Sequence, residues 1–107
     1  MEDAELAIVS FGTTSRSCKA AVKQARKRGY KVGLIRLRTI WPFADEYFEK
    51  IANEIKQFIV VEVNYGQIKL EVERCVGKKV HLLPKMGGEI HRPEEIYKKI
   101  KEVYNGN

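Results

Sequence analysis

The sequence lacks long hydrophobic runs and a basic, apolar leader. A membrane-spanning helix needs ~20 apolar residues, and every apolar stretch in this 107-residue chain is far shorter. The chain begins Met1-Glu2-Asp3-Ala4-Glu5, which is acidic where a signal peptide would be basic. We therefore expect a cytoplasmic protein without membrane contact.

Cysteine and histidine are scarce. Cys18 and Cys75 are far apart, and no CxxC motif or Cys/His cluster occurs, so local spacing forms neither a zinc site nor an iron–sulfur ligand set. We interpret both as small apolar residues on helices. His81 and His91 have no carboxylate or nucleophile pattern beside them, which indicates structural roles. We predict no metal ligand and no catalytic residue in this chain.

Familiar phosphate-binding and hydrolase motifs are also missing. The sequence contains no GxGxxG, GxxxxGKS/T or GxSxG pattern. The first apolar run ends in Ser10-Phe11-Gly12 rather than in a pair of acids, which argues against a receiver-type phosphoacceptor site. These absences argue against the dinucleotide-binding, P-loop and α/β-hydrolase classes.

The charge is unevenly distributed. The chain carries 20 Lys and Arg against 14 Asp and Glu, a formal net charge of +6, and its 44% of hydrophobic residues suit one compact domain. The excess comes from a segment without acidic residues. Neither interleaved aromatic residues nor a helix-turn-helix accompanies it, so we expect no nucleic-acid binding. A solvated helix face and a contact for an acidic partner remain as alternatives. The bases concerned are Arg16, Lys19, Lys23, Arg26, Lys27, Arg28 and Lys31.

Four short apolar runs predict four strands, at residues 6–11, 32–37, 58–63 and 80–84. Helical periodicity follows each of them. Four strand–helix units with right-handed crossovers give a three-layer α/β/α fold around a mostly parallel sheet. Residues 1–107 are expected to form a single domain.

The predicted strand order is 2-1-3-4. The polar residues Arg36 and His81 fall in the second and fourth strands, which favours edge positions for these two. In that order the winding direction reverses between strands one and three, so a crevice opens at their carboxyl ends. Residues 12–15 and 64–67 would line it.

The predicted helices have apolar stripes and recognisable ends. Gly29 and Gly77 are expected to end the first and third helices, and Pro42 and Pro93 to open the second and fourth. Asn64 is expected to cap the third helix. The residues expected to face the core are Cys18, Ala21, Val22 and Ala25; Tyr47, Phe48, Ile51, Ala52 and Ile55; Ile68, Val72, Cys75 and Val76; and Ile96, Ile100, Val103 and Tyr104.

The segment after the first strand offers a candidate anion site. Thr13, Thr14 and Ser15 bring hydroxyls and backbone amides to a helix N-terminus, and Arg16 adds positive charge. Ser and Thr are also ordinary helix caps. Two interpretations stay open, an anion or CoA site and a cap without a ligand.

Four segments of the sequence together resemble a known family. They are Ile-Val-Ser-Phe-Gly-Thr-Thr at 8–14, Leu-Arg-Thr-Ile-Trp-Pro-Phe at 37–43, Val-Val-Glu-Val-Asn-Tyr-Gly-Gln at 60–67, and the Gly-Gly pair at 87–88 before Pro-Glu-Glu-Ile at 93–96. Nearly the whole chain resembles the transketolase C-terminal-like domain of the alpha subunit of 2-oxoacid:ferredoxin oxidoreductases. The first segment is shared with the wider class, including E1-beta subunits of 2-oxoacid dehydrogenases.

The resemblance implies an oxidoreductase complex that decarboxylates a 2-oxoacid on thiamine diphosphate, passes electrons through an iron–sulfur cluster to ferredoxin, and forms an acyl-CoA. Thiamine diphosphate, Mg and the cluster are implied for other domains or subunits, because this chain has no GDG motif and no cysteine set. The resemblance therefore implies a non-catalytic domain, inactive alone, that supports assembly with the rest of the alpha chain and the beta subunit.

Two departures from the family pattern stand out. Arg92 replaces the small hydroxyl residue that usually precedes the Pro-Glu-Glu helix start, so that helix must be capped otherwise. Only residues 1–4 remain for an antiparallel edge strand that the domain class carries before its first parallel strand. We interpret the chain as an excised domain or a split subunit.

The loops that carry the resemblance are expected to form a contact surface, since all of them follow strands. Trp41 and Tyr65 are residue types that interfaces favour as anchors. Alternatively, Trp41 packs over the end of the sheet. The interface or motif residues are Trp41, Pro42, Phe43, Asn64, Tyr65, Gly66 and Gln67.

Other functions remain open from the sequence. One is a stand-alone nucleotide- or anion-binding α/β module that shares only the fold. Another is the C-terminal domain of an E1-beta subunit, and a third is a basic nucleic-acid-binding domain. The high content of Lys, Arg and Glu, with few Gln or Asn, is typical of a thermophile.

Overall fold

The computed structural model describes residues 3–11, 14–37, 45–62, 67–84 and 92–106, and strands and helices alternate along them. The helices and strands are, in chain order, β1 (Leu6–Phe11), α1 (Thr14–Lys27), β2 (Val32–Leu37), α2 (Asp45–Ile51), β3 (Gln57–Glu62), α3 (Gln67–Val76), β4 (His81–Pro84) and α4 (Pro93–Tyr104).

The described strands form one parallel sheet with the order β2-β1-β3-β4, which confirms the predicted order. In the middle of the sheet, Ile8 of β1 lies between Leu34 of β2 and Ile59 of β3. Ile8 and Ile59 are completely buried, whereas Arg36 on edge strand β2 is exposed and His81 on edge strand β4 is half-buried. The polar residues thus mark the edges because a central strand is covered on both faces.

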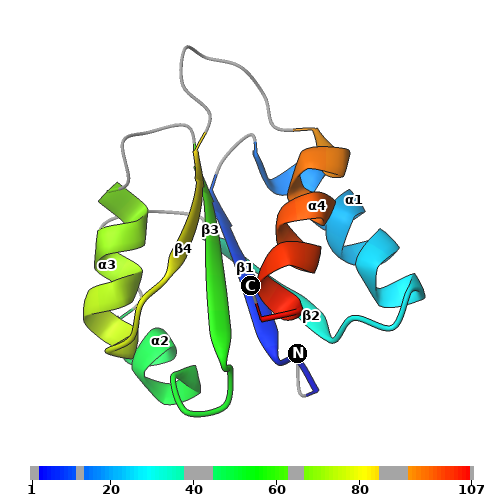
Figure 1. The fold of residues 1–107 in the computed structure, drawn as a ribbon. Helices are drawn as coiled ribbons and strands as arrows, with labels where there is room; N and C mark the ends of the chain where they lie inside the picture. Colours follow the sequence, from blue (N-terminus) through cyan, green and yellow to red (C-terminus); the bar gives the residue numbers. More distant parts are fainter. Residues whose placement is uncertain (1–2, 12–13, 38–44, 63–66, 85–91, 107) are drawn as a thin grey trace.

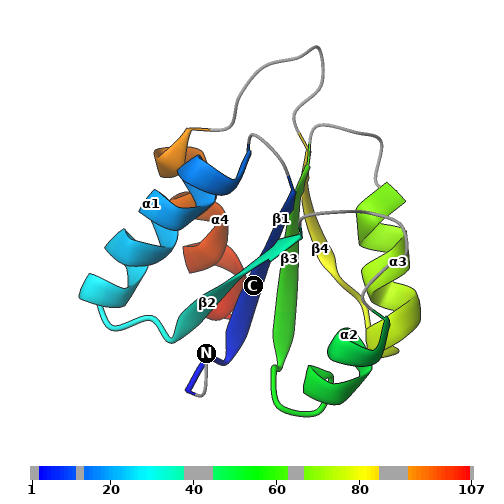
Figure 2. The same ribbon diagram turned by 180° about the vertical axis from the view of Figure 1, so that it is seen from behind.

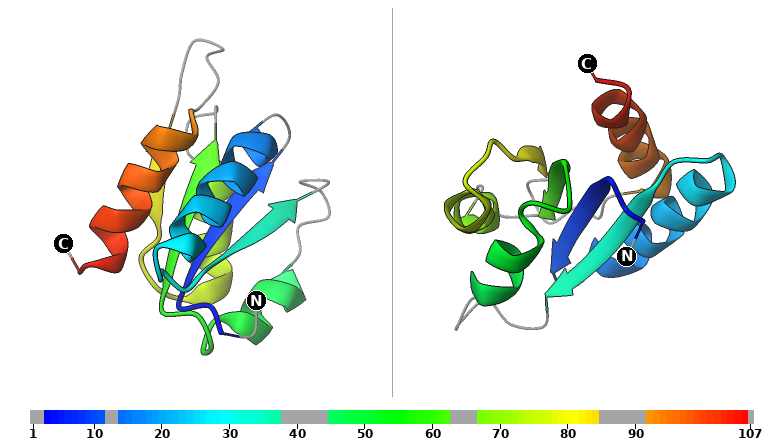
Figure 3. Two further views of the ribbon diagram at one scale, coloured as in Figure 1. Left: turned by 90° about the vertical axis from the view of Figure 1, so that its right-hand side faces the viewer. Right: turned by 90° about the horizontal axis from the view of Figure 1, so that it is seen from below.

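Helices cover both faces of the sheet (Figures 1 and 2). α1 and α4 pack on one face, and α2 and α3 pack on the other. Successive side chains of β1 alternate between the two faces of the sheet. Leu6 and Ile8 belong to the core beneath α1 and α4, and Ala7 and Val9 belong to the core beneath α2 and α3. The predicted three-layer α/β/α architecture is confirmed, and the right-hand view of Figure 3 shows the layers end-on.

α2 differs from its prediction. Phe48 and Ile51 are buried as expected, but Tyr47 is 44% exposed. The helix ends at Ile51, and Ala52 and Ile55 are buried in the turn that follows. The core position predicted for Tyr47 was wrong, because this short helix turns only residues three apart toward the sheet. The Tyr47 ring instead lies edge-on against Phe48, with 5.8 Å between ring centroids.

Two helices end at glycines, as predicted. Gly29 has a φ of +91° and Gly77 a φ of +69°, a left-handed backbone conformation that other residues adopt at a cost. α4 begins at Pro93, and in place of a hydroxyl cap the Glu95 carboxylate accepts a hydrogen bond of 3.3 Å from the Arg92 backbone N–H. α3 begins at Gln67, and the predicted cap Asn64 lies outside the described residues.

Polar contacts fasten the helices to the amino-terminal ends of the strands. Arg26 of α1 donates through Nε to the Val32 carbonyl at 2.7 Å, and its two terminal nitrogens contact the carboxylate of Asp3 at 3.2 and 2.9 Å. Tyr104 of α4 donates to Glu5 at 2.6 Å, and this bond is the main reason that the pKa of Glu5 is lowered. Residues 3–5 form no strand, so the described part of the chain has no antiparallel edge strand.

Candidate functional site at the carboxyl edge of the sheet

The carboxyl-terminal ends of the strands lie together at one edge of the sheet because the strands are parallel. The strand arrows run to this edge in the left-hand view of Figure 3. α1 begins at this edge at Thr14, soon after β1 ends in the sequence. α3 begins there at Gln67, soon after β3 ends. We call this region the carboxyl edge. It is the place at which a parallel sheet of this order binds ligands.

A buried hydrogen bond fixes the first turn of α1 to the end of β1. The hydroxyl oxygens of Ser10 and Ser15 are 3.0 Å apart, and the two residues are only 1% and 7% exposed. A buried hydroxyl without a partner is costly, so this pair holds the strand end and the helix start together. The Ser15 hydroxyl is thereby occupied inside the fold, and Arg16 next to it is exposed.

The structure places only part of the predicted site. Thr14 and Gln67 are the first residues of α1 and α3, and Ser15 and Arg16 lie in the first turn of α1. The remaining predicted site residues lie outside the described residues: Thr13, Trp41, Pro42, Phe43, Asn64, Tyr65 and Gly66. The contact surface predicted for these loops therefore stays a prediction.

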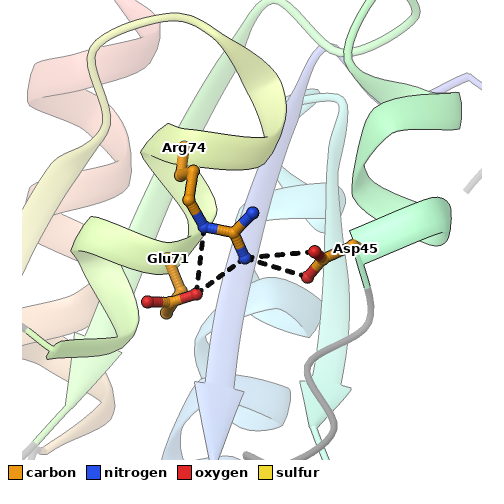
Figure 4. A network of polar contacts seen from close by, with 3 residues as sticks. All are labelled: Asp45, Glu71 and Arg74. Atoms are coloured by element: carbon orange, nitrogen blue, oxygen red, sulfur yellow. Dashed lines mark hydrogen bonds and ion pairs between the residues drawn. The ribbon is translucent and has the colours of Figure 1, made fainter.

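A charged network that sequence reasoning missed joins α2 to α3 (Figure 4). One terminal guanidinium nitrogen of Arg74 contacts both carboxylate oxygens of Asp45, at 3.0 and 3.1 Å, and the Glu71 carboxylate at 2.8 Å. Hydrogen bonding to Arg74 lowers the pKa of Asp45, and Asp45 and Glu71 together raise the pKa of Arg74 further above its high ordinary value. Glu71 and Arg74 are three residues apart on one helix, which is a visible sequence signal, but the link to Asp45 spans 29 positions.

The two cysteines are buried on helices, as predicted, and lie on opposite faces of the sheet without a disulfide between them. Cys18 belongs to the core beneath α1 and α4, and Cys75 to the core beneath α2 and α3. Burial, and then the charge of Asp45, raises the pKa of the Cys75 thiol to about 11, so it is neutral at pH 7. Separated by the sheet, these sulfurs do not fit the ligand set of an iron–sulfur cluster.

His81 has the environment of a structural residue. Burial, followed by repulsion from Lys99, Lys79 and Lys69, lowers its pKa below the ordinary value of 6.5. Its imidazole is therefore neutral at pH 7. His91 lies outside the described residues.

The described ranges offer neither a metal-binding cluster nor a membrane-spanning helix. Among these residues no group of three or more His, Cys, Asp or Glu is arranged to hold a metal ion. The helices of this part of the chain are all too short or too polar to cross a membrane. The Mg²⁺ that accompanies thiamine diphosphate would therefore find no carboxylate cluster among the described residues.

Comparisons with known proteins agree on one family. Residues 4–96 match the family described as pyruvate:ferredoxin oxidoreductase core domain II. The chain is 45% identical over 101 residues to the 2-oxoglutarate synthase subunit KorA of Methanothermobacter marburgensis, covering 92% of this chain and 27% of that protein. It is 38% identical over 104 residues to the ketoisovalerate oxidoreductase subunit VorB of the same organism, covering 96% of this chain and 30% of that protein.

A solved structure has the same fold. The 2-oxoglutarate:ferredoxin oxidoreductase of Magnetococcus marinus, solved with 2-oxoglutarate, coenzyme A and succinyl-CoA bound, matches 97% of this chain with a TM-score of 0.87 and 25% identity. The match covers 18% of that chain. Like the KorA and VorB relatives, the Magnetococcus marinus protein is much longer than the present chain. On the agreement of sequence and structure, the chain belongs to the core domain II family of the 2-oxoacid:ferredoxin oxidoreductases.

Proposed function

We propose that this chain is a non-catalytic domain of a 2-oxoacid:ferredoxin oxidoreductase, with assembly of the enzyme as its main role. The observation that carries the proposal is the 45% identity to a 2-oxoglutarate synthase subunit across nearly the whole chain, which covers only 27% of that subunit. The assembled enzyme would convert a 2-oxoacid to an acyl-CoA and pass the electrons to ferredoxin. A stand-alone anion-binding module and an E1-beta domain are not favoured, because the relatives are subunits of these oxidoreductases.

The catalytic groups belong to other parts of that enzyme in this proposal. Thiamine diphosphate, Mg and an iron–sulfur cluster need ligands that the two buried cysteines on opposite sheet faces do not supply. What this chain contributes is a rigid sheet whose carboxyl edge presents loops to the rest of the alpha chain and to the beta subunit. The Ser10–Ser15 bond holds the start of α1 beside these loops, and the Asp45–Arg74 contact ties α2 to the last turn of α3.

The isolated chain is expected not to bind thiamine diphosphate. Calorimetric titration of the chain with thiamine diphosphate and Mg²⁺ should give no saturable heat, because the described residues hold no metal-binding carboxylate cluster. The same titration of the enzyme assembled with its thiamine-binding partner subunit is the positive control. Saturable binding in the micromolar range by the chain alone would contradict a non-catalytic role.

An anion site at the start of α1 is the second part of the proposal. It would take a phosphate or the diphosphate of CoA on the backbone N–H groups near Thr13, Thr14 and Ser15, with Arg16 adding charge. The Magnetococcus marinus relative was solved with coenzyme A bound, which supports a CoA-related role for the enzyme. Since the Ser15 hydroxyl already contacts Ser10, backbone donors and Arg16 would carry the binding.

The anion site makes a residue-level prediction for NMR. Adding CoA should shift the backbone amide signals of residues 12–17, and Arg16→Ala should weaken the binding by about tenfold, since charge-assisted contacts contribute roughly 1.5–3 kcal/mol. Lys27→Ala at the other end of α1 is the matched control and should leave the affinity nearly unchanged. If CoA and inorganic phosphate both leave the amides of residues 12–17 unshifted, α1 has an ordinary capped start.

Two finer assignments are also proposals. A thermophilic source rests on the Lys, Arg and Glu content, and a cytoplasmic location rests on the relatives, which are oxidoreductase subunits. The 2-oxoacid is left unspecified, because the relatives act on different ones according to their names, 2-oxoglutarate, ketoisovalerate and pyruvate.

A further inference from the structure

The solvent side of α1 carries a row of positive charges. Arg16, Lys19, Lys23 and Lys27 follow one another at spacings of three or four residues, so they lie on one face of the helix over about three turns. All four residues are exposed. None of the four forms an ion pair within the part of the chain that the structure describes. We call these four residues the α1 cationic stripe.

Two neighbouring bases, Arg26 and Arg28, have structural partners and do not belong to the stripe, and Lys31 lies beyond the end of α1. Arg26 is bound to Asp3 and to the Val32 carbonyl. The Arg28 guanidinium lies 5.8 Å from the ring centroid of Tyr97 on α4, in cation–π geometry. The structure thus separates Arg26 and Arg28, which hold the fold together, from the four bases of the stripe.

The stripe weakens the helix that carries it. Lys19, Lys23 and Lys27 are each four residues apart, and like charges at that spacing repel. Arg16 stands in the first turn, at the positive end of the helix dipole, and that turn contains no acidic residue. The segment from 14 to 27 has five bases and no acid to relieve either effect.

Each of the other three helices contains acidic residues, whereas α1 contains none, although Arg26 and Lys27 do suit the negative end of its dipole. α2 has Asp45 in its first turn and Lys50 in its last, and α4 has Glu94 and Glu95 in its first turn. In α3, Lys69 and Glu73 form an ion pair across four residues, with 3.2 Å between nitrogen and oxygen. α1 is thus the one described helix that carries bases without any acid, and this one-sided charge points to a role outside the fold.

The chemistry of the stripe points to a polar, short-lived contact. The stripe residues alternate with small or polar exposed residues, Ala20 and Gln24 among them. Permanent subunit interfaces are more apolar and poor in lysine. Exposed lysines instead speed the encounter with an acidic surface in a salt-dependent way. A nucleic acid is disfavoured because no aromatic residue for base stacking stands among these charges.

We propose that the α1 cationic stripe is a transient docking surface for the acidic face of a ferredoxin, the protein that accepts electrons from the assembled enzyme. This rests on the proposed function, which supplies ferredoxin as a partner. In this proposal the stripe guides and holds the ferredoxin, and the redox centre that gives up the electron lies in another part of the enzyme.

A single substitution separates docking from folding. Lys23→Glu places an acid four residues from both Lys19 and Lys27, so it should keep or raise the melting temperature of the domain while it opposes an acidic partner. Lys50→Glu is the matched control. It makes the same charge change on α2, which packs on the opposite face of the sheet from α1. Both variants would be made in the full-length subunit and assembled with the partner subunits.

The readout is the KM for an acidic ferredoxin at low and at physiological ionic strength, with the rate toward methyl viologen used to normalise the amount of active enzyme. Lys23→Glu should raise the ferredoxin KM about fivefold at low salt and flatten its salt dependence, and Lys50→Glu should change neither. An unaltered KM and salt dependence in Lys23→Glu would overturn the proposal, as would tight binding of a random DNA duplex at physiological salt that this variant abolishes. A wild-type enzyme that reduces neither ferredoxin nor viologen would refute the proposed function instead.

Discussion

Replacing Leu6 with alanine should lower the free energy of unfolding by about 3 kcal/mol. Leu6 opens the central strand β1, is completely buried, and belongs to the core beneath α1 and α4. Removing its side chain takes away buried apolar surface and leaves a cavity that a central strand, paired on both sides, closes poorly. A domain of this size has a total stability of roughly 5–15 kcal/mol, so the loss is a large fraction of the whole.

Leu70→Ala is the matched control, because it removes the same atoms from a residue that is 62% exposed on α3. Its expected effect is below about 0.5 kcal/mol. Urea unfolding followed by circular dichroism measures both variants, and the slope of the transition should stay the same in each. Equal losses for Leu6→Ala and Leu70→Ala would contradict the burial described for β1.

Replacing Trp41 with alanine should weaken binding of the chain to the other subunits by about 30-fold, equivalent to about 2 kcal/mol. Trp41 follows β2, so the proposed function puts it at the carboxyl edge, where the loops of this fold meet a partner. Large aromatic side chains at the centre of an interface contribute most of its binding energy. Calorimetric titration with the partner subunit gives the dissociation constant.

Tyr47→Ala is the control for that titration. Tyr47 is also a partly exposed aromatic residue, 44% exposed, but it stands on α2, beside the lower half of the sheet in Figure 1. Its removal should leave the dissociation constant within about twofold. A loss of affinity in Tyr47→Ala and none in Trp41→Ala would place the interface on the α2 and α3 side of the domain.

Much of the fold was predictable because its signals are local. The continuous apolar runs around Ile8 and Ile59 indicated two strands buried on both faces, and Arg36 and His81 indicated the edges. Together these observations predicted the sheet order that the structure shows. Gly29 was predictable as a helix end for the same reason, since the left-handed turn after a helix is a property of one residue and its neighbours.

The parts that were missed depend on contacts across the sequence. Tyr47 has the periodicity of a core residue, and only the short length and the packing of α2 leave it exposed. Arg74 reaches Asp45 over 29 positions, a contact that exists only after α2 and α3 have packed on the same sheet face. The Ser10–Ser15 bond likewise depends on the angle at which α1 leaves β1, which no spacing rule gives.

The same distinction applies to the candidate site. The sequence correctly indicated that the first turns of α1 and α3 follow the central strands, which the structure places at the carboxyl edge. It did not indicate that the hydroxyl of Ser15 is buried against Ser10 and so faces into the fold. Backbone donors and exposed side chains are therefore the groups by which this edge would meet a ligand or a partner subunit.

The most direct test of the assembly role uses the single tryptophan of the chain. Incorporating 5-fluorotryptophan gives one ¹⁹F signal, from Trp41, that is followed while an unlabelled beta subunit is added. An interface at the carboxyl edge predicts a signal that differs between H₂O and D₂O in the free chain and that shifts and loses this solvent effect in the complex. A Trp41 signal that is already shielded from solvent, and that stays unchanged when the beta subunit is added, would contradict assembly through this edge.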